Sequence, residues 1–177
     1  MRRRRHPEWI KVKAPGSPNY LRLKRILREK NLHTVCEEAR CPNIGECWGN
    51  KTATFLILGD TCTRGCRFCA IDKGKPLALD PEEPRNVALV VKDLGLDHIV
   101  VTSVNRDDLP DGGSSHFAKT VFWIKSLSPG IRVELLIPDF DGNLAAVKTV
   151  VDSGIEILNH NIETVPRLYG KVRPGHS

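Results

Sequence analysis

The chain has 177 residues, of which 40% are hydrophobic and 27% charged, a composition typical of a globular protein rather than a disordered or fibrous one. No apolar run approaches the roughly 20 residues of a membrane-spanning helix, and the basic N-terminus lacks the apolar stretch of a secretory signal. The net charge of +6 is uneven, because residues 1–30 carry +9 and the remaining residues carry −3. These totals predict a cytoplasmic protein of about one domain with a basic N-terminal arm.

The first fifty residues are predicted to form an arm, a helix and a cysteine-bearing loop. Prolines interrupt residues 1–18, which predicts an extended arm, and the apolar stripe of residues 20–30 predicts a helix capped by Asn19. Residues 33–50 are polar and punctuated by Gly and Pro, which predicts a loop without an independent hydrophobic core. We therefore expect residues 1–50 to be an extension organised around its cysteines.

From residue 51 onward, predicted strands alternate with predicted helices. Apolar β-rich runs predict strands at residues 52–60, 98–104, 131–138 and 155–161. The helices are predicted from Asp80 to Gly95 (with Pro81 in the first turn and Glu83 completing a capping box), over residues 115–126, and from Asn143 to Gly154. This alternation predicts the α/β class, with about four βα units and a parallel sheet, too few units to close a barrel.

All six cysteines fall in two triplets between residues 36 and 69. The first triplet is Cys36, Cys41 and Cys47, spaced C-x4-C-x5-C, and the second is Cys62, Cys66 and Cys69, spaced C-x3-C-x2-C. Cysteines clustered in a cytoplasmic chain indicate metal binding or catalysis rather than disulfides. Because the second triplet follows the first predicted strand, it should lie at the carboxyl edge of the sheet, where reactive groups gather in βα barrels.

The second triplet suits an iron–sulfur cluster with an open position. Three thiolates hold three irons of a [4Fe–4S] cluster, which otherwise takes four cysteines, and leave the fourth iron free to bind a small molecule. Zinc prefers four tetrahedral ligands, and no nearby His or Cys completes this triplet. A zinc-stabilised nucleic-acid-binding protein stays as an alternative, disfavoured by the βα pattern and by the charge of −3 outside residues 1–30.

The second triplet, with Phe68 just before its last cysteine, resembles the signature of the radical S-adenosylmethionine (radical SAM) enzymes. The resemblance implies a partial (β/α)6 TIM-like barrel that carries a [4Fe–4S] cluster after its first strand. It also implies that the open iron chelates the amino and carboxylate groups of S-adenosylmethionine. An electron from the cluster would then cleave the sulfonium to give a 5′-deoxyadenosyl radical.

The first triplet narrows the resemblance to lipoyl synthases. The stretches that carry it are WIKVKAPGS (9–17), the two triplets, TSVNRDDLPDGG (102–113), LIPDF (136–140) and NHNIETVPRLYGKVRP (159–174). The resemblance implies insertion of two sulfur atoms at C6 and C8 of a protein-bound octanoyl group. It implies that the second triplet holds the cluster that cleaves S-adenosylmethionine, and that the first holds an auxiliary [4Fe–4S] cluster that donates sulfur. Another radical SAM enzyme with an auxiliary cluster, such as an RNA methylthiotransferase, is the enzymatic alternative.

The lipoyl synthase resemblance also implies partners. These are octanoylated lipoyl carrier proteins (lipoyl domains of 2-oxoacid dehydrogenases and the glycine cleavage H protein) and an electron donor such as ferredoxin or flavodoxin, with no membrane and no nucleic acid. The charge of the arm motivates a hypothesis that Arg2 to Arg5 dock the carrier. The simpler interpretation of the arm is a solvated tail.

Seven further residues are predicted to contact S-adenosylmethionine from strand ends. Phe68 would pack on the adenine, Thr102, Ser103, Asn105 and Arg106 would meet the methionine part, and Asn161 and Glu163 would hydrogen-bond the ribose hydroxyls. Taken singly, each is equally consistent with a cap or a turn. His160 is predicted to be structural, and Asp111-Gly112-Gly113 to be a turn.

Lipoyl synthases continue past the end of this sequence, with two more βα strands and an R-S-S-Y motif whose serine is the fourth ligand of the auxiliary cluster. No R-S-S-Y occurs here, and Ser177 lacks its context. Residues 51–177 are therefore interpreted as an incomplete radical SAM core, from a fragment or a truncated gene rather than half of a split enzyme. We expect an exposed apolar edge at the fourth strand, poor solubility, and no lipoyl product from the 177-residue chain alone, although iron binding persists.

Overall fold

A computed structural model of the chain describes residue 7, residues 10–12 and residues 14–173. The helices are α1 (Pro18–Glu29), α2 (Val35–Glu38), α3 (Ile44–Gly49), α4 (Glu83–Leu94), α5 (Ser114–Leu127), α6 (Leu144–Val151) and α7 (Tyr169–Val172), with 3-10 turns η1 (Phe140–Gly142) and η2 (Pro166–Leu168). The strands are β1 (His33–Thr34), β2 (Thr54–Ile57), β3 (Thr61–Cys62), β4 (Asp72–Lys73), β5 (His98–Ser103), β6 (Arg132–Leu136) and β7 (Ile157–Asn159). Arg2 to Arg5 and Ser177 lie outside the described residues.

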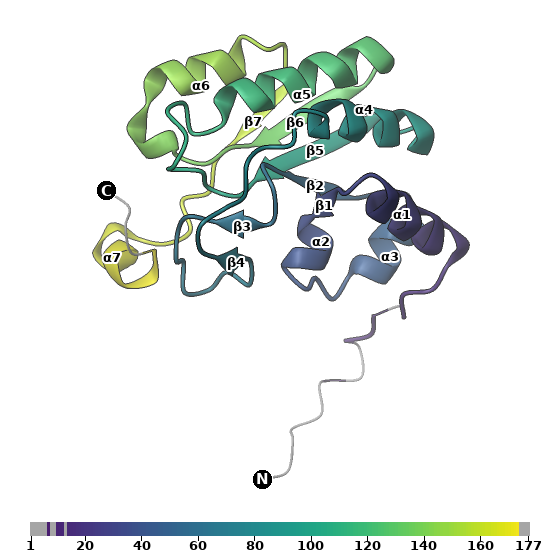
Figure 1. Cartoon of the computed structure of the whole chain (residues 1–177). Helices are drawn as coiled ribbons and strands as arrows, with labels where there is room; N and C mark the ends of the chain where they lie inside the picture. The colour runs from purple at the N-terminus through teal and green to yellow at the C-terminus, as the bar shows by residue number, and fades with distance from the viewer. Residues whose placement is uncertain (1–6, 8–9, 13, 174–177) are drawn as a thin grey trace.

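The main sheet has the strand order β1-β2-β5-β6-β7. The last four strands are parallel and follow one another in chain order, whereas β1 pairs antiparallel with β2. Helices α4, α5 and α6 lie together along one side of this sheet, and α1, α2 and α3 lie on the other side near β1 and β2 (Figure 1). The predicted α/β class and the four parallel strands are confirmed, and within the described residues the sheet stays open.

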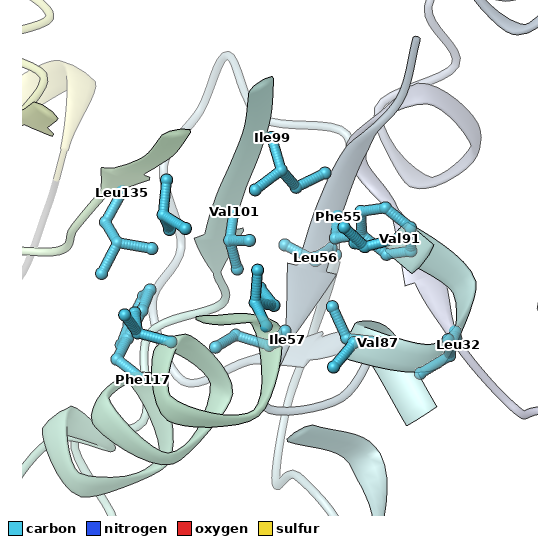
Figure 2. Packing of buried hydrophobic residues seen from close by; sticks show 14 of the residues in the cluster. Leu32, Phe55, Leu56, Ile57, Val87, Val91, Ile99, Val101, Phe117 and Leu135 are labelled. Atoms are coloured by element: carbon cyan, nitrogen blue, oxygen red, sulfur yellow. The ribbon is translucent and has the colours of Figure 1, made fainter. Parts of the chain in front are cut away.

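The strand register assigns alternate residues to the two faces of the sheet. Val87 of α4 and Phe117 of α5 lie on the same side as Ile57 and Val101 of the strands (Figure 2). All four side chains are at most 1% exposed. Burying each contributes about 1.5–3 kcal/mol, so this helix-covered face anchors the fold.

The N-terminal extension is more ordered than the predicted loop. Thr34 caps α2, its hydroxyl oxygen accepting the Glu37 N–H at 3.3 Å, and α3 carries Trp48, which is fully buried. The rings of Trp48 and Tyr20 lie 5.0 Å apart, which packs α1 on α3. The prediction of a loop over residues 33–50 is therefore wrong, because one cap and one buried indole suffice to fix two short helices.

Two predicted helix starts are also wrong. Helix α1 is capped by Ser17, whose hydroxyl oxygen accepts the Tyr20 N–H at 3.2 Å, with a proline in the first turn. Asn19 instead donates its side-chain amide to the Gly49 carbonyl at 2.8 Å. The Ser17-Pro18 pair is the stronger signal for a helix start. Proline has no backbone N–H, and at the first helical position this costs nothing because an N–H there has no partner within the helix.

The second error concerns α4, which begins at Glu83 rather than after Asp80. Glu83 does not complete a capping box, because its carboxylate is buried and accepts the Leu58 N–H at 2.9 Å. The same oxygen lies 2.7 Å from His116 Nε2 on α5. The Glu83 carboxylate therefore bonds to the residue after β2 and to α5, and not to the N-terminus of its own helix. By contrast, the predicted end of α4 at Gly95 and the predicted start of α6 at Asn143 are confirmed, since both depend on local geometry alone.

The β7 edge of the sheet is apolar and exposed. Ile157 and Leu158 are 39% and 41% exposed, which confirms the expected apolar edge at the fourth parallel strand. Among the described residues, no helix has both the length and the apolar character needed to span a membrane.

Candidate functional site

A cavity of about 260 Å³ lies on the face of the sheet opposite α4 and α5. Leu56, Thr102 and Leu136 are register neighbours on β2, β5 and β6, and together they form its floor. Val35, the first residue of α2, and Ala39, which directly follows α2, line it from the side of the first triplet. The segments that carry both cysteine triplets therefore border one cavity.

The cavity gathers residues that are distant in sequence. Six of the seven predicted S-adenosylmethionine contacts line it, together with two second-triplet cysteines: Phe68, Thr102, Ser103, Asn105, Asn161, Glu163, Cys62 and Cys69. The structure thus brings these residues together, while their individual roles stay predictions. The Thr102 hydroxyl donates to the Leu136 carbonyl at 2.8 Å, so toward a ligand this side chain is an acceptor.

Arg106 is the predicted contact that the structure does not bring to the cavity. Its side chain is 3% exposed, and it donates two hydrogen bonds to the Asp108 carboxylate at 2.9 Å. It also donates to the carbonyls of Leu58 at 3.0 Å and Leu77 at 3.1 Å. Its guanidinium therefore links the segment after β2 to the segment after β5, and a contact with the methionine part stays a prediction that this geometry does not support.

The second triplet lies on the loop between β2 and α4. Cys62 ends the short strand β3, and its Sγ accepts the backbone N–H groups of Arg64 and Asn105, each at 3.4 Å. The Cys69 N–H donates to the Cys66 carbonyl at 3.3 Å, which turns the loop between these two thiols. All three cysteines are partly exposed and none forms a disulfide, which suits ligands beside a cavity.

The first triplet is held by α2 and α3. The Cys41 N–H donates to the Cys36 carbonyl at 3.0 Å, so the backbone turns between these two residues and brings them near each other. Burial raises the pKa of the Cys47 thiol, and the neighbouring Cys36, Cys41 and Glu46 raise it further. Both other cysteines of the triplet thus lie near enough to Cys47 to influence its pKa.

In the part of the chain that the structure describes, no three His, Cys, Asp or Glu side chains converge as single-ion ligands. Such convergence is what one zinc ion requires. In a [4Fe–4S] cluster each thiolate binds a different iron, so the three thiols of a triplet need not converge on one ion.

Arg173 is a cavity residue that sequence reasoning missed. It is 7% exposed and lines the cavity, and its Nη1 donates to the Asn161 carbonyl at 3.3 Å. The Arg67 N–H donates to the Val172 carbonyl at 3.0 Å, which holds α7 against the second-triplet loop. The only signal in the sequence was its place in the NHNIETVPRLYGKVRP stretch.

Two buried polar atoms of the cavity wall lack a hydrogen-bond partner among the described residues. They are Arg173 Nε and Ser103 Oγ. Buried polar groups are almost always hydrogen-bonded, so these two atoms fit a polar ligand in the cavity. His160 also lines the cavity, and its Nδ1 lies 2.9 Å from the Ile137 carbonyl, which fits the predicted structural role.

The turn at Asp111-Gly112-Gly113 is also confirmed. Both glycines have positive φ, +60° and +90°, and a Cβ on Gly113 would lie 2.4 Å from Leu58 Cδ1. The Asp111 carboxylate accepts the N–H groups of Gly113 and Ser115, both at 2.9 Å, at the start of α5. Burial alone would raise the pKa of Asp111, but these bonds outweigh it and lower the pKa.

Comparison with known proteins agrees with this geometry. Residues 56–177 match the model of the radical SAM superfamily, and residues 1–41 match that of the N-terminal domain of lipoyl synthase of the radical SAM family. The chain is 62% identical to a lipoyl synthase of Chloroflexus aggregans and 60% identical to one of Roseiflexus sp., over 97% of its own length in both. A lipoyl synthase of Rubrobacter xylanophilus is 59% identical over 95% of the chain.

The chain spans 56%, 57% and 52% of these three relatives, which is about half of their length. The superfamily match covers more than half of the chain and includes the second triplet and every strand end that forms the cavity. The chain therefore belongs to the radical SAM superfamily, and over nearly its whole length it is similar to the lipoyl synthases of that superfamily.

Proposed function

We propose that this chain carries the two cluster sites of a lipoyl synthase, which inserts sulfur at C6 and C8 of an octanoyl group bound to a carrier protein. The observation that carries the proposal is the shared cavity, bordered by the α2 segment of the first triplet and the loop of the second. A carbon radical formed from an unactivated C–H bond needs a sulfur donor close by, and two clusters beside one cavity supply that proximity.

In this proposal, Cys62, Cys66 and Cys69 hold a [4Fe–4S] cluster whose open iron takes S-adenosylmethionine. When bound, this pair supplies a 5′-deoxyadenosyl radical. The chain's own residues then place the cofactor: Phe68 packs on its adenine, and Asn161 and Glu163 bind its ribose hydroxyls. The unpartnered Ser103 Oγ and the adjoining Thr102 and Asn105 face its methionine part.

The first triplet, Cys36, Cys41 and Cys47, would hold the auxiliary [4Fe–4S] cluster that donates sulfur. The raised pKa of Cys47 means that this thiol stays protonated in the absence of metal, so cluster binding must release its proton. We assign residues 1–50 to this auxiliary extension and residues 51–177 to the radical SAM core.

The partners of the proposed reaction are octanoylated lipoyl carriers, namely lipoyl domains of 2-oxoacid dehydrogenases and the glycine cleavage H protein. An electron donor such as ferredoxin or flavodoxin would reduce the cluster, and the reaction would take place in the cytoplasm.

The first experiment measures iron and acid-labile sulfide after anaerobic reconstitution, with spectra before and after addition of S-adenosylmethionine. About eight irons per chain, as two cubes require, with a spectral change on adding S-adenosylmethionine, would support both cluster sites. About four irons with that change would support the second site and mean that the first triplet does not hold its cluster without the R-S-S-Y serine. Zinc without iron or sulfide would overturn the proposal in favour of a nucleic-acid-binding protein.

A further inference from the structure

Two side chains between Cys62 and Cys66 bind the second-triplet loop to Asp107, in the segment after β5. The carboxylate of Asp107 accepts two hydrogen bonds from the Arg64 guanidinium, at 2.7 and 2.8 Å. The Thr63 hydroxyl lies 2.7 Å from Asp107 Oδ2 and 3.1 Å from the Asn105 carbonyl, and it accepts the Asp107 N–H at 3.2 Å. We call Thr63, Arg64 and Asp107 the loop brace.

The brace has a buried arginine at its centre, and the charges of its partners match it. The Arg64 side chain is 5% exposed, and its Nη1 also donates to Asp139 after β6 at 2.6 Å. Burial alone would lower the pKa of Arg64, but the bonds to Asp107 and Asp139 outweigh it and raise the pKa. The Arg64 hydrogen bonds in turn lower the pKa of Asp107. Both groups are therefore charged at neutral pH, and the loop is tied to the ends of two neighbouring strands.

The brace joins the two residues whose N–H groups point at Cys62. One donor to Cys62 Sγ is the backbone of Arg64, and the other is the backbone of Asn105. Asn105 is in turn held by the Thr63 N–H, which donates to its carbonyl at 3.1 Å. Loosening the brace should therefore move two hydrogen-bond donors away from the Cys62 sulfur.

We propose that Thr63, Arg64 and Asp107 are positioning residues that aim the Arg64 and Asn105 N–H groups at Cys62 and thereby set the reduction potential of the cluster on the second triplet. The inference rests on the proposed function, because it requires a cluster at that triplet. Reduction adds negative charge to the cluster and its thiolates, and an N–H donor to sulfur stabilises that charge. Losing the two donors should therefore make the potential more negative.

The sharpest test substitutes Thr63, because this change leaves the charge of the site untouched. In a background carrying Cys36→Ala, Cys41→Ala and Cys47→Ala, only the second triplet can hold a cluster. We expect Thr63→Val to give a more negative midpoint potential in a redox titration followed by electron paramagnetic resonance. Thr63→Ser should keep the wild-type potential, because it retains the hydroxyl.

The matched control is Thr149→Val on α6, which removes another threonine hydroxyl bond, from Oγ1 to the Ala145 carbonyl, on an exposed helix face. Equal potentials in Thr63→Val and this control would overturn the proposal. Loss of the cluster in Thr63→Val, but not in Thr63→Ser or the control, would support a positioning role.

A second test replaces an arginine and one of its carboxylate partners together, so that the net charge does not change. Arg64→Met with Asp107→Asn removes the brace, whereas Arg106→Met with Asp108→Asn removes a neighbouring pair that does not contact Cys62. We expect the first exchange to shift the potential negatively, and the second to leave it where it was. Equal shifts would overturn the proposal. If the three-cysteine background without further substitutions takes up no iron at the second triplet, the proposed function itself is contradicted, which separates the two failures.

Discussion

The two cysteine triplets have the same number of thiols but are supported in different ways. The first is held mainly by backbone structure, with Cys36 on α2 and Cys47 on α3, which packs on α1. The second lies on a loop whose shape depends on charged side chains, Arg64 above all. Helices tolerate loss of any one contact, whereas a loop held by a few ion pairs can be adjusted residue by residue. In the proposed reaction this difference matches a cluster that is consumed and a cluster that is kept.

Replacing single cysteines should have different effects on S-adenosylmethionine cleavage in the two triplets. We expect Cys66→Ala to abolish cleavage of S-adenosylmethionine, because it removes one of three ligands of the cluster with the open iron. Cys41→Ala should lower the iron content but retain the cleavage. The measurement is formation of 5′-deoxyadenosine with dithionite as reductant. Cleavage by the Cys66 variant equal to that by the Cys41 variant would invalidate the division of roles.

A glycine substitution should disturb the second triplet alone. Gly113→Ala places a methyl group 2.4 Å from Leu58 Cδ1, and Leu58 is 1% exposed at the start of the second-triplet loop. We expect a loss of about 1–3 kcal/mol in the free energy of unfolding relative to Gly154→Ala. Gly154 is the matched control, since its φ of +88° is close to the +90° of Gly113 but nothing lies within 4 Å of an added Cβ.

Urea denaturation of the apo chain measures the difference between the two glycine variants, and iron content shows where it acts. Iron should be lost from the second triplet in Gly113→Ala. Equal unfolding free energies in the two variants would mean that Leu58 moves aside without cost.

Iron binding at the first triplet should depend on the Thr34 cap of α2. Thr34→Val keeps the shape of a fully buried side chain but loses the hydroxyl that accepts the Glu37 N–H. We expect a destabilisation of about 1 kcal/mol by urea denaturation, and a faster loss of iron from the first triplet than from the second. Thr34→Ser, which retains the cap, is the control, and iron loss at the same rate from both triplets would contradict the separate support of α2.

The smallest expected effect is a pH dependence of stability that comes from Asp107, which holds the second-triplet loop. The pKa of Asp107 is lowered, chiefly by its hydrogen bonds from Arg64. Its contribution to stability is therefore complete above the unfolded-state pKa of about 3.9 and is lost as the pH falls through the lower folded-state value. Since the carboxylate is 38% exposed, solvent screening keeps this contribution small.

Unfolding free energies of apo wild-type and Asp107→Asn should accordingly differ most near about pH 6 and converge toward about pH 3. A difference that grows on acidification would show that Asp107 does not stabilise the fold as a carboxylate.

Sequence patterns predicted the elements whose signals are local. Gly95 ends α4 in a left-handed conformation, and Asn143 caps α6, as their positions beside apolar runs indicated. The alternation of strands and helices likewise predicted four parallel strands. Periodicity and capping depend on residues within one or two turns, which a sequence displays directly.

Contacts between distant segments could not be predicted in this way. Arg106 and Arg173 both follow strands, yet only Arg173 reaches the cavity. Arg64 lies between two predicted ligands, but its partners Asp107 and Asp139 are 43 and 75 residues away. Such pairings depend on which loops meet at the edge of the sheet, and their only trace in the sequence is in stretches that resemble lipoyl synthases.

The short strand β1 has a thermodynamic consequence. Its two residues pair with Phe55 and Leu56 of β2, and α2 begins directly after it with Val35 and Cys36. Opening that pairing therefore also displaces a thiol of the first triplet. Whatever the first triplet binds in the native state, but not in the unfolded one, will stabilise the edge of the sheet by linkage. The melting temperature of the protein will accordingly report the occupancy of the first triplet.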